Sequence, residues 1–124
     1  MGTSSEDYLK CILVLREEKE HVRSVDVAHS MGVTKPSVSN AMKKLRKEGM
    51  IIFDKNGFIE FTEAGLKLAE KIHDKHLIIE KVLLHIGVSE QTAKKEACMI
   101  EHAISDETYG CLKAFHSDYR PKTV

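Results

Sequence analysis

Two short helical patterns separated by one glycine constrain the fold of this chain more than any other feature. The segment HVRSVDVAHSMGV spaces apolar residues like an amphipathic helix, with Ser24 placed to cap its start and Gly32 placed to end it. The next segment, TKPSVSNAMKKLRKEG, offers Thr34 as N-cap, Pro36 in the first turn and Gly49 as its end. Two short helices joined by a tight turn that contains glycine are typical of a helix-turn-helix.

The remaining pattern predicts a mainly α chain with one hairpin. A helix is expected in SSEDYLKCILVLREE, with Ser4 or Ser5 as N-cap, and MIIFDKNGFIEF indicates two short strands around an Asn-Gly turn. From Thr62 onward we expect one long helix or two in series, then a helix from Ser89 through EACMIEHAIS, then a last helix in SDETYGCLKAF. A hairpin directly after the helix pair makes the arrangement a winged helix-turn-helix.

The order of elements divides the chain into a winged helix-turn-helix domain at residues 1–72 and a helical domain at residues 73–124. With 124 residues, the chain can bury one modest core or two small subdomains, and a large enzyme is excluded. No apolar run approaches the roughly 20 residues of a membrane span, and the start MGTSSEDY is unlike a signal peptide. We therefore expect a cytoplasmic protein with no membrane partner.

The three cysteines are odd in number and far apart, which favours free thiols in a reducing compartment over a disulfide framework. Cys11 and Cys111 fall on apolar helical faces and are interpreted as core residues.

Charge is unevenly placed along the chain, although the net charge is zero. The window from Thr34 to Lys47 holds five cations and no acid, so the second helix of the pair carries a positive local field. In such a helix the N-terminal residues contact base edges, and lysines further along contact phosphates. A solvated helix face is the plainer alternative, but helix order and charge together favour DNA. The predicted DNA contacts are Lys35, Ser37, Ser39, Asn40, Lys43, Lys44, Lys47 and, at the hairpin tip, Lys55.

The segment EACMIEHAIS places a thiol, a carboxylate and an imidazole within five positions. Cys98, Glu101 and His102 stand at i, i+3 and i+4, so their side chains project from one face of a helix. Thiolate and imidazole bind Fe, Co, Ni and Zn well, and the carboxylate also admits Mn. His76 and Glu80, at i and i+4, are a second pair that could share or adjoin this site. A purely structural role remains open, because a buried cysteine often behaves as a small hydrophobe.

Three segments, EACMIEHAISDE, VTKPSVSNAMKKLRKEGMI and FTEAG, together resemble the diphtheria-toxin-repressor family of metal-dependent transcriptional regulators, including its manganese-responsive branch. The resemblance covers roughly residues 5–115 and extends to the order and separation of the motifs. It implies a winged helix domain, a helical dimerisation domain and two divalent cations bound between them. It also implies a homodimeric repressor that binds a palindromic operator on double-stranded DNA, with the divalent metal as co-repressor.

Carried over position by position, the resemblance implies six metal ligands, namely Asp7, His76, Glu80, Cys98, Glu101 and His102. It also matches Pro36, Ser37, Ser39 and Asn40 to the start of the recognition helix. The chain departs from the manganese branch at Lys10 and Cys98, where that branch has carboxylate ligands, and from the iron branch at Lys94, where that branch has a histidine. The thiolate favours Fe(II) as the cofactor, with Mn(II) as the alternative and other divalent transition metals as substitutes in vitro.

Two other functions fit parts of the pattern. One is a winged-helix regulator whose metal motif is vestigial. The other is a small metal-dependent hydrolase, since Cys, Glu and His can hold a catalytic zinc with an open position. The hydrolase is disfavoured because the sequence shows no H-E-x-x-H, Gly-rich phosphate loop or nucleophile elbow. We therefore expect a regulator and not an enzyme.

Overall fold

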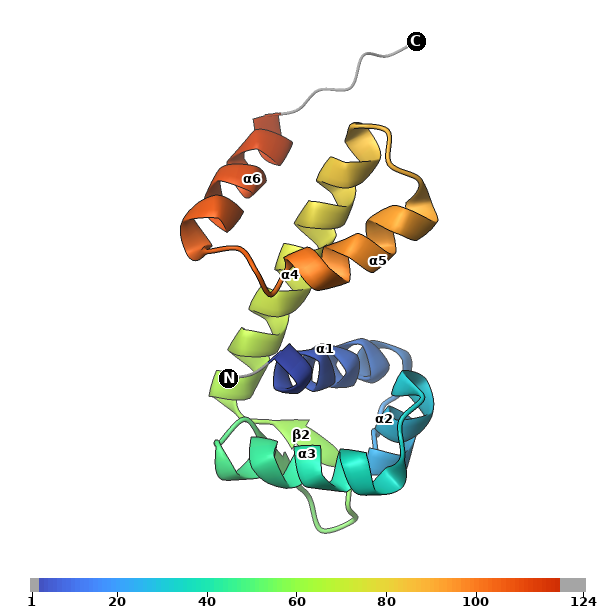
Figure 1. Ribbon diagram of the computed structural model, residues 1–124. Helices are drawn as coiled ribbons and strands as arrows, with labels where there is room; N and C mark the ends of the chain where they lie inside the picture. Colours follow the sequence, from blue (N-terminus) through green and yellow to red (C-terminus); the bar gives the residue numbers. More distant parts are fainter. Residues whose placement is uncertain (1–2, 119–124) are drawn as a thin grey trace. The chain divides into compact units, whose positions relative to one another are not determined.

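The computed structural model describes residues 3–118, which form six helices and one antiparallel pair of strands (Figure 1). The elements in chain order are α1 (Thr3–Glu18), α2 (Ser24–Met31), α3 (Lys35–Lys47), β1 (Ile51–Phe53), β2 (Ile59–Phe61), α4 (Glu63–His85), α5 (Glu90–Ile100) and α6 (Asp106–Asp118). The chain divides into two compact units, one ending at Lys71 and the other beginning at Ile72. The elements and their order confirm the mainly α winged-helix prediction. None of the helices in the described part has the length and hydropathy of a membrane span.

The first unit buries one apolar core between α1, α2, α3 and the hairpin (Figure 1). Val38, Met42 and Leu45 form the buried stripe of α3. Leu9 and Ile12 of α1 are fully buried in the same core. Side chains of this size each stabilise a fold by about 1.5–3 kcal/mol when buried, so the stripe fixes which face of α3 points outward.

The start of α3 follows the predicted capping pattern. The hydroxyl oxygen Oγ1 of Thr34 accepts a hydrogen bond from the Ser37 N–H at 3.3 Å, and Pro36 occupies the first turn. Gly32 ends α2 with φ of 66°, a left-handed conformation that glycine adopts without strain. The tight turn between the two helices therefore matches the sequence prediction.

The starts of α1 and α2 differ from the predicted caps. α1 begins at Thr3, so Ser4 and Ser5 lie inside the helix. α2 begins at Ser24 itself, and the carboxylate of Asp26 accepts a hydrogen bond from the Arg23 N–H at 2.9 Å. A carboxylate in the first turn also interacts favourably with the helix dipole, which explains why it takes the place of the serine cap.

The hairpin pairs Ile51 with Phe61 and Phe53 with Ile59. Its turn is organised by the carboxylate of Asp54, which accepts hydrogen bonds from the N–H groups of Asn56 at 2.8 Å and Phe58 at 2.9 Å. The ring of Phe58 also contacts two side chains of the α1–α2 loop. The ring of His21 stacks on it at 4.3 Å, and the Arg23 guanidinium lies 4.6 Å from its centroid. The wing is therefore attached to the helix-turn-helix by side-chain contacts.

The hairpin passes into α4 through a crowded junction. Oγ1 of Thr62 accepts a hydrogen bond from the Gly65 N–H at 3.0 Å and donates one to the Gly49 carbonyl at 2.6 Å. A Cβ added to Gly65 would clash with the backbone carbonyl of Met50. α4 then continues to His85 as one helix, which resolves the choice between one helix and two.

The second unit comprises the C-terminal part of α4 with α5 and α6. Its buried apolar residues in the described part are few, two isoleucines and two alanines: Ile72, Ile79, Ala93 and Ala97. Lys75 links α4 to α6, because its ammonium lies 3.6 Å from a carboxylate oxygen of Asp106 and 5.8 Å from the Tyr109 ring. Several large apolar side chains stay exposed on this unit, namely Leu77, Leu84, Ile86, Met99 and Phe115.

Two further predictions fail in the second unit. Cys111 is exposed on α6 and is not a core residue, whereas Cys11 is half-buried. α5 ends at Ile100, so Glu101 and His102 lie in the turn that follows rather than on the helix. The chain must reverse there to begin α6, and the Ala103 N–H already bonds to the Ile100 carbonyl in a tighter turn.

Candidate metal centre and nucleic-acid interface

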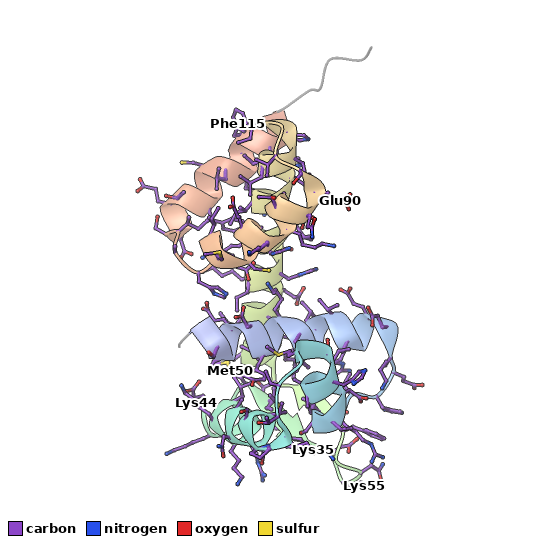
Figure 2. All side chains as sticks on the ribbon, turned by 45° about the vertical axis from the view of Figure 1, so that its right-hand side comes forward. Lys35, Lys44, Met50, Lys55, Glu90 and Phe115 are labelled. Carbon is purple, nitrogen blue, oxygen red and sulfur yellow. The ribbon has the colours of Figure 1, made fainter. Side chains whose placement is uncertain are left out.

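The residues predicted to contact DNA are all exposed in the first unit. Figure 2 shows Lys35 and Lys44 on α3 and Lys55 at the hairpin. The complete set is Lys35, Pro36, Ser37, Ser39, Asn40, Lys43, Lys44, Lys47 and Lys55. Their exposure follows from the buried stripe of α3, because residues that are not on the stripe must face away from the core.

A groove of about 450 Å³ runs beside α3, bounded by the start of α2 and by β1. Three cations line it, Lys35, Lys43 and Arg46, and no acid does. Its apolar lining includes Val25, which is 51% exposed, and Phe53. A groove lined by cations and by apolar side chains can accept a phosphate together with an uncharged sugar or base edge.

Arg46 lines this groove but is absent from the predicted DNA contacts. It stands three positions after Lys43, so it shares the helix face that Lys43 occupies. The same spacing rule could have identified it from the sequence. Val25 and Phe53 come from other elements and carried no such signal.

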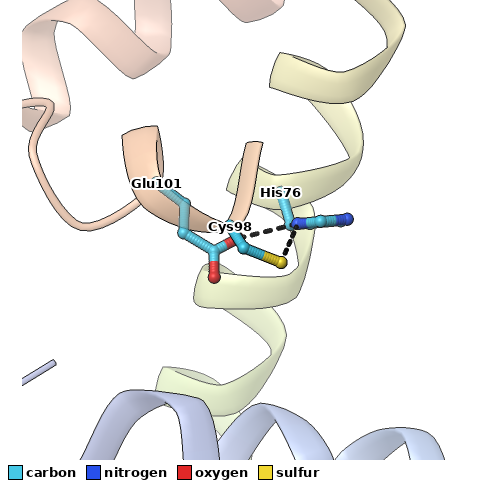
Figure 3. A group of neighbouring side chains, drawn as sticks. All are labelled: His76, Cys98 and Glu101. Atoms are coloured by element: carbon cyan, nitrogen blue, oxygen red, sulfur yellow. Dashed lines mark hydrogen bonds and ion pairs between the residues drawn. The ribbon is translucent and has the colours of Figure 1, made fainter. Parts of the chain in front are cut away.

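A buried group of donors lies inside the second unit (Figure 3). Nδ1 of His76 on α4 lies 3.0 Å from Oε2 of Glu101 and 3.6 Å from Sγ of Cys98 on α5. His76 is 8% exposed and Glu101 is 3% exposed. Burying an imidazole and a carboxylate is costly unless they have partners, so their placement together indicates a candidate binding site.

The spacing of these donors fits a transition-metal ion. Ligand bonds of about 2.0–2.3 Å place two donors about 2.8–3.8 Å apart when they meet at angles between 90° and 110°. The contacts that His76 makes with Glu101, at 3.0 Å, and with Cys98, at 3.6 Å, fall within this range. One nitrogen, one sulfur and one oxygen form a mixed donor set that suits Fe(II) or Zn(II), and a carboxylate also suits Mn(II).

Two more of the predicted ligands lie next to this group. Nε2 of His76 lies 3.0 Å from Oε2 of Glu80, and Nε2 of His102 lies 3.4 Å from Oε1 of Glu101. The structure therefore brings together all the predicted ligands of the second unit. Asp7, the remaining candidate, is half-buried on α1 in the first unit.

The backbone conformation of Glu101 explains why its side chain still reaches the site although α5 ends at Ile100. Glu101 keeps helical torsion angles, with φ of −57° and ψ of −26°, and its N–H bonds to the Ala97 carbonyl. Its side chain therefore leaves the backbone near the position that a continued helix would have given it. Only the chain after it turns away, toward α6.

The two halves of the chain match two domain families. Residues 1–58 match the N-terminal DNA binding domain of the iron dependent repressors, and residues 62–121 match the metal binding and dimerisation domain of the same repressors.

Curated relatives match over nearly the whole chain. An HTH-type transcriptional regulator of Methanocaldococcus jannaschii is 36% identical over 98% of this chain and 99% of its own. The transcriptional regulator MntR of Escherichia coli is 33% identical over 94% of this chain and 76% of its own.

The structure of the manganese regulator SloR superposes with a TM-score of 0.80 and 33% identity, over 91% of this chain. This chain spans 53%, or about half, of that solved chain. The matching relatives and domains are transcriptional regulators and not enzymes. The chain belongs to the iron dependent repressor family of metal-dependent transcriptional repressors, which is also called the diphtheria-toxin-repressor family.

Proposed function

We propose that this chain forms a homodimer that binds a palindromic operator when it is loaded with Fe(II) or Mn(II), and so controls metal homeostasis. The observation that carries the proposal is the buried group of His76, Cys98 and Glu101, whose spacing suits one cation. A cation at this position would neutralise buried negative charge and hold three separate side chains together.

The outward face of α3 is the proposed DNA reader. Ser37, Ser39 and Asn40 stand near its N-terminus, where residues of a recognition helix reach base edges. Lys43, Lys44 and Lys47 follow and contact phosphates, as Lys55 does from the wing. We add Arg46 to this set, because it lines the groove with Lys35 and Lys43.

A second copy of the chain is the proposed partner of the second unit. That unit has a small core and leaves Leu84, Ile86 and Phe115 exposed, at 39%, 69% and 58%. Large apolar side chains of this kind gain free energy when another surface covers them. Two-fold pairing would place two copies of α3 on successive half-sites of a palindrome.

Metal would couple to DNA binding if it joined the two units. We propose Asp7 from the first unit as a ligand, with His76, Cys98, Glu101 and His102 from the second. Such a link would restrict the spacing of the two recognition helices. A preference of about 1–3 kcal/mol for the competent arrangement is enough to switch operator occupancy.

We propose Fe(II) as the preferred metal and Mn(II) as the alternative. The thiolate of Cys98 is a soft ligand, which favours Fe(II) over Mn(II), although relatives named for manganese share the fold. In the Cys98→Glu variant the donor is hard, so relative affinity should move toward Mn(II). The affinities are measured by anaerobic chelator competition. If the ratio of Fe(II) affinity to Mn(II) affinity is the same in the variant and the parent, Cys98 is not a ligand.

The test of the whole proposal is selection from random duplexes at fixed salt. Dialysed protein is incubated anaerobically with chelator, Fe(II) or Mn(II), and the retained DNA is sequenced. Enrichment of a palindrome only with metal is the expected result, and the more effective metal identifies the cofactor. Equal enrichment with chelator would leave a DNA reader with a vestigial metal site.

A further inference from the structure

We infer that Glu80 is a positioning residue that acts through His76, and not a metal ligand. In this role it accepts a hydrogen bond from Nε2–H of His76 and leaves Nδ1 as the nitrogen that binds the cation. The inference rests on the proposed function, since it assigns a role within the same metal site. It departs from the ligand role that the resemblance implies for this position.

The two ring nitrogens of His76 have different neighbours. Nδ1 faces Cys98 at 3.6 Å and Glu101 at 3.0 Å, whereas Nε2 faces Glu80 at 3.0 Å. A neutral imidazole has one N–H and one lone pair, and only the nitrogen with the lone pair can bind a metal. A carboxylate accepts but does not donate, so Glu80 accepts the hydrogen on Nε2 when a cation occupies the lone pair of Nδ1.

One cation cannot contact both Nδ1 of His76 and the carboxylate of Glu80 in this arrangement. The two nitrogens point to opposite sides of the ring, so an oxygen bonded at Nε2 lies well beyond the ~2.0–2.2 Å of a metal–oxygen bond to an ion at Nδ1. Glu80 therefore belongs outside the donor group of His76, Cys98 and Glu101.

A separate metal site built on Glu80 would need further donors. Within residues 3–118, the donor groups of three or more that surround His76 do not include Glu80. Lys94, the position at which the iron branch has a histidine ligand, is an exposed residue of α5. A lysine repels a cation unless it loses its proton, so it does not complete such a site.

The contact between Glu80 and His76 is well shielded. The side chains are 16% and 10% exposed, so water competes weakly for the hydrogen bond. A carboxylate that holds the far nitrogen of a metal-bound histidine fixes the orientation of the ring and raises its basicity. Loss of such a partner typically weakens metal binding about 10–100-fold.

Two substitutions separate the positioning role from a ligand role. Glu80→Gln retains an oxygen that can accept the Nε2–H, whereas Glu80→Leu has similar bulk and no acceptor. We expect Glu80→Leu to weaken Mn(II) and Fe(II) affinity about 10–100-fold, Glu80→Gln to recover most of it, and metal stoichiometry to stay unchanged in both. Equal losses in both variants, with one metal fewer per chain, would identify Glu80 as a ligand and overturn the inference.

The hydrogen position can be read with the diamagnetic ion Zn(II) bound, because in metal-free protein Glu101 faces Nδ1 at the same 3.0 Å and competes for the hydrogen. In Zn(II)-loaded protein labelled with ¹⁵N-histidine, long-range ¹H–¹⁵N correlations should show His76 with its hydrogen on Nε2, and a mixture of both forms in Glu80→Leu. The matched control is Glu70→Leu, which removes an exposed carboxylate from the same helix. A parent protein with the hydrogen on Nδ1 would refute the inference.

The same measurements separate failure of the inference from failure of the proposed function. If His76→Ala loses metal affinity while Glu80→Leu binds metal like the parent, the proposed metal site is supported and the positioning role of Glu80 is wrong. If His76→Ala also binds metal like the parent, the proposed metal site itself is wrong.

Discussion

Nδ1 of His76 and Oε2 of Glu101 lie 3.0 Å apart, although 25 positions separate the two residues in the chain. His76 comes from α4, and Glu101 follows directly after the end of α5. Fully buried Ala93 and Ala97 keep the side chains short on the inner face of α5, so the helix can lie close to its neighbours. The donor group is thus built by packing within one unit.

Metal should protect one cysteine from alkylation and leave another unchanged. The thiol of Cys98 lies 3.6 Å from His76, and a metal–thiolate bond would block its reaction with iodoacetamide. We expect Fe(II) or Mn(II) to slow labelling of Cys98 at least tenfold relative to chelator, as measured by mass spectrometry. Exposed Cys111 is the internal control, and equal slowing of both thiols would indicate a global effect and not ligation.

Cys11 is a second internal reference in the alkylation experiment, because its half-buried thiol should react slowly. Burial raises the pKa of this thiol, and the nearby Glu18 carboxylate adds to the increase, although a hydrogen bond with Ser30 opposes it. Less thiolate is therefore present at neutral pH, so Cys11 should react more slowly than Cys111 with or without metal.

Local patterns in the sequence were sufficient for the helix pair but not for the whole site. Thr34 and Pro36 predicted the start of α3 because capping depends on neighbouring residues only. The end of α5 at Ile100 was not predictable in this way, because apolar spacing continues past it. His76 and Cys98 meet through tertiary packing, so spacing along the chain suggested only that His76 and Glu80 could share or adjoin the site of Cys98, and the family resemblance added His76 to the ligands.

Arg46→Ala should weaken DNA binding without changing which sequence is preferred. Arg46 lines the groove with Lys43, and removing a cation that neutralises one phosphate should lower the slope of log K against log salt by about 0.9. The measurement is affinity at several salt concentrations, for operator and for random duplex. Lys95→Ala removes an exposed cation from α5 and serves as the control. Equal slopes for Arg46→Ala and the parent would remove Arg46 from the interface.

Asp26→Ala should destabilise the first unit in a manner that depends on pH. The Lys19 ammonium at 2.7 Å, together with the Arg23 N–H, holds the pKa of the Asp26 carboxyl below its usual range. A lowered pKa means that the stabilisation is complete above the unfolded value near 3.8 and is lost as pH falls through the lower folded value. Loss of a helix cap costs about 1 kcal/mol at neutral pH.

Urea unfolding of the parent and of Asp26→Ala at neutral and acidic pH tests this expectation. The difference in free energy of unfolding should shrink as pH falls below about 4, because the parent then also loses the charge. Asp74→Ala, at an exposed position of α4, should show no comparable pH-dependent difference. A difference that is constant with pH would mean that the carboxylate charge does not stabilise the start of α2.

Two glycines in helices should respond in opposite directions to the same substitution. Gly65 in α4 has no room for a Cβ, which would meet the backbone carbonyl of Met50, whereas Gly110 in α6 has nothing within 4 Å of that position. Gly65→Ala must displace the strand junction and should lower the free energy of unfolding by more than about 2 kcal/mol. Gly110→Ala gains helix propensity of about 1 kcal/mol and should raise the melting temperature. Thermal unfolding of both variants is the measurement. A Gly65→Ala protein as stable as the parent would show that a Cβ fits between the start of α4 and Met50.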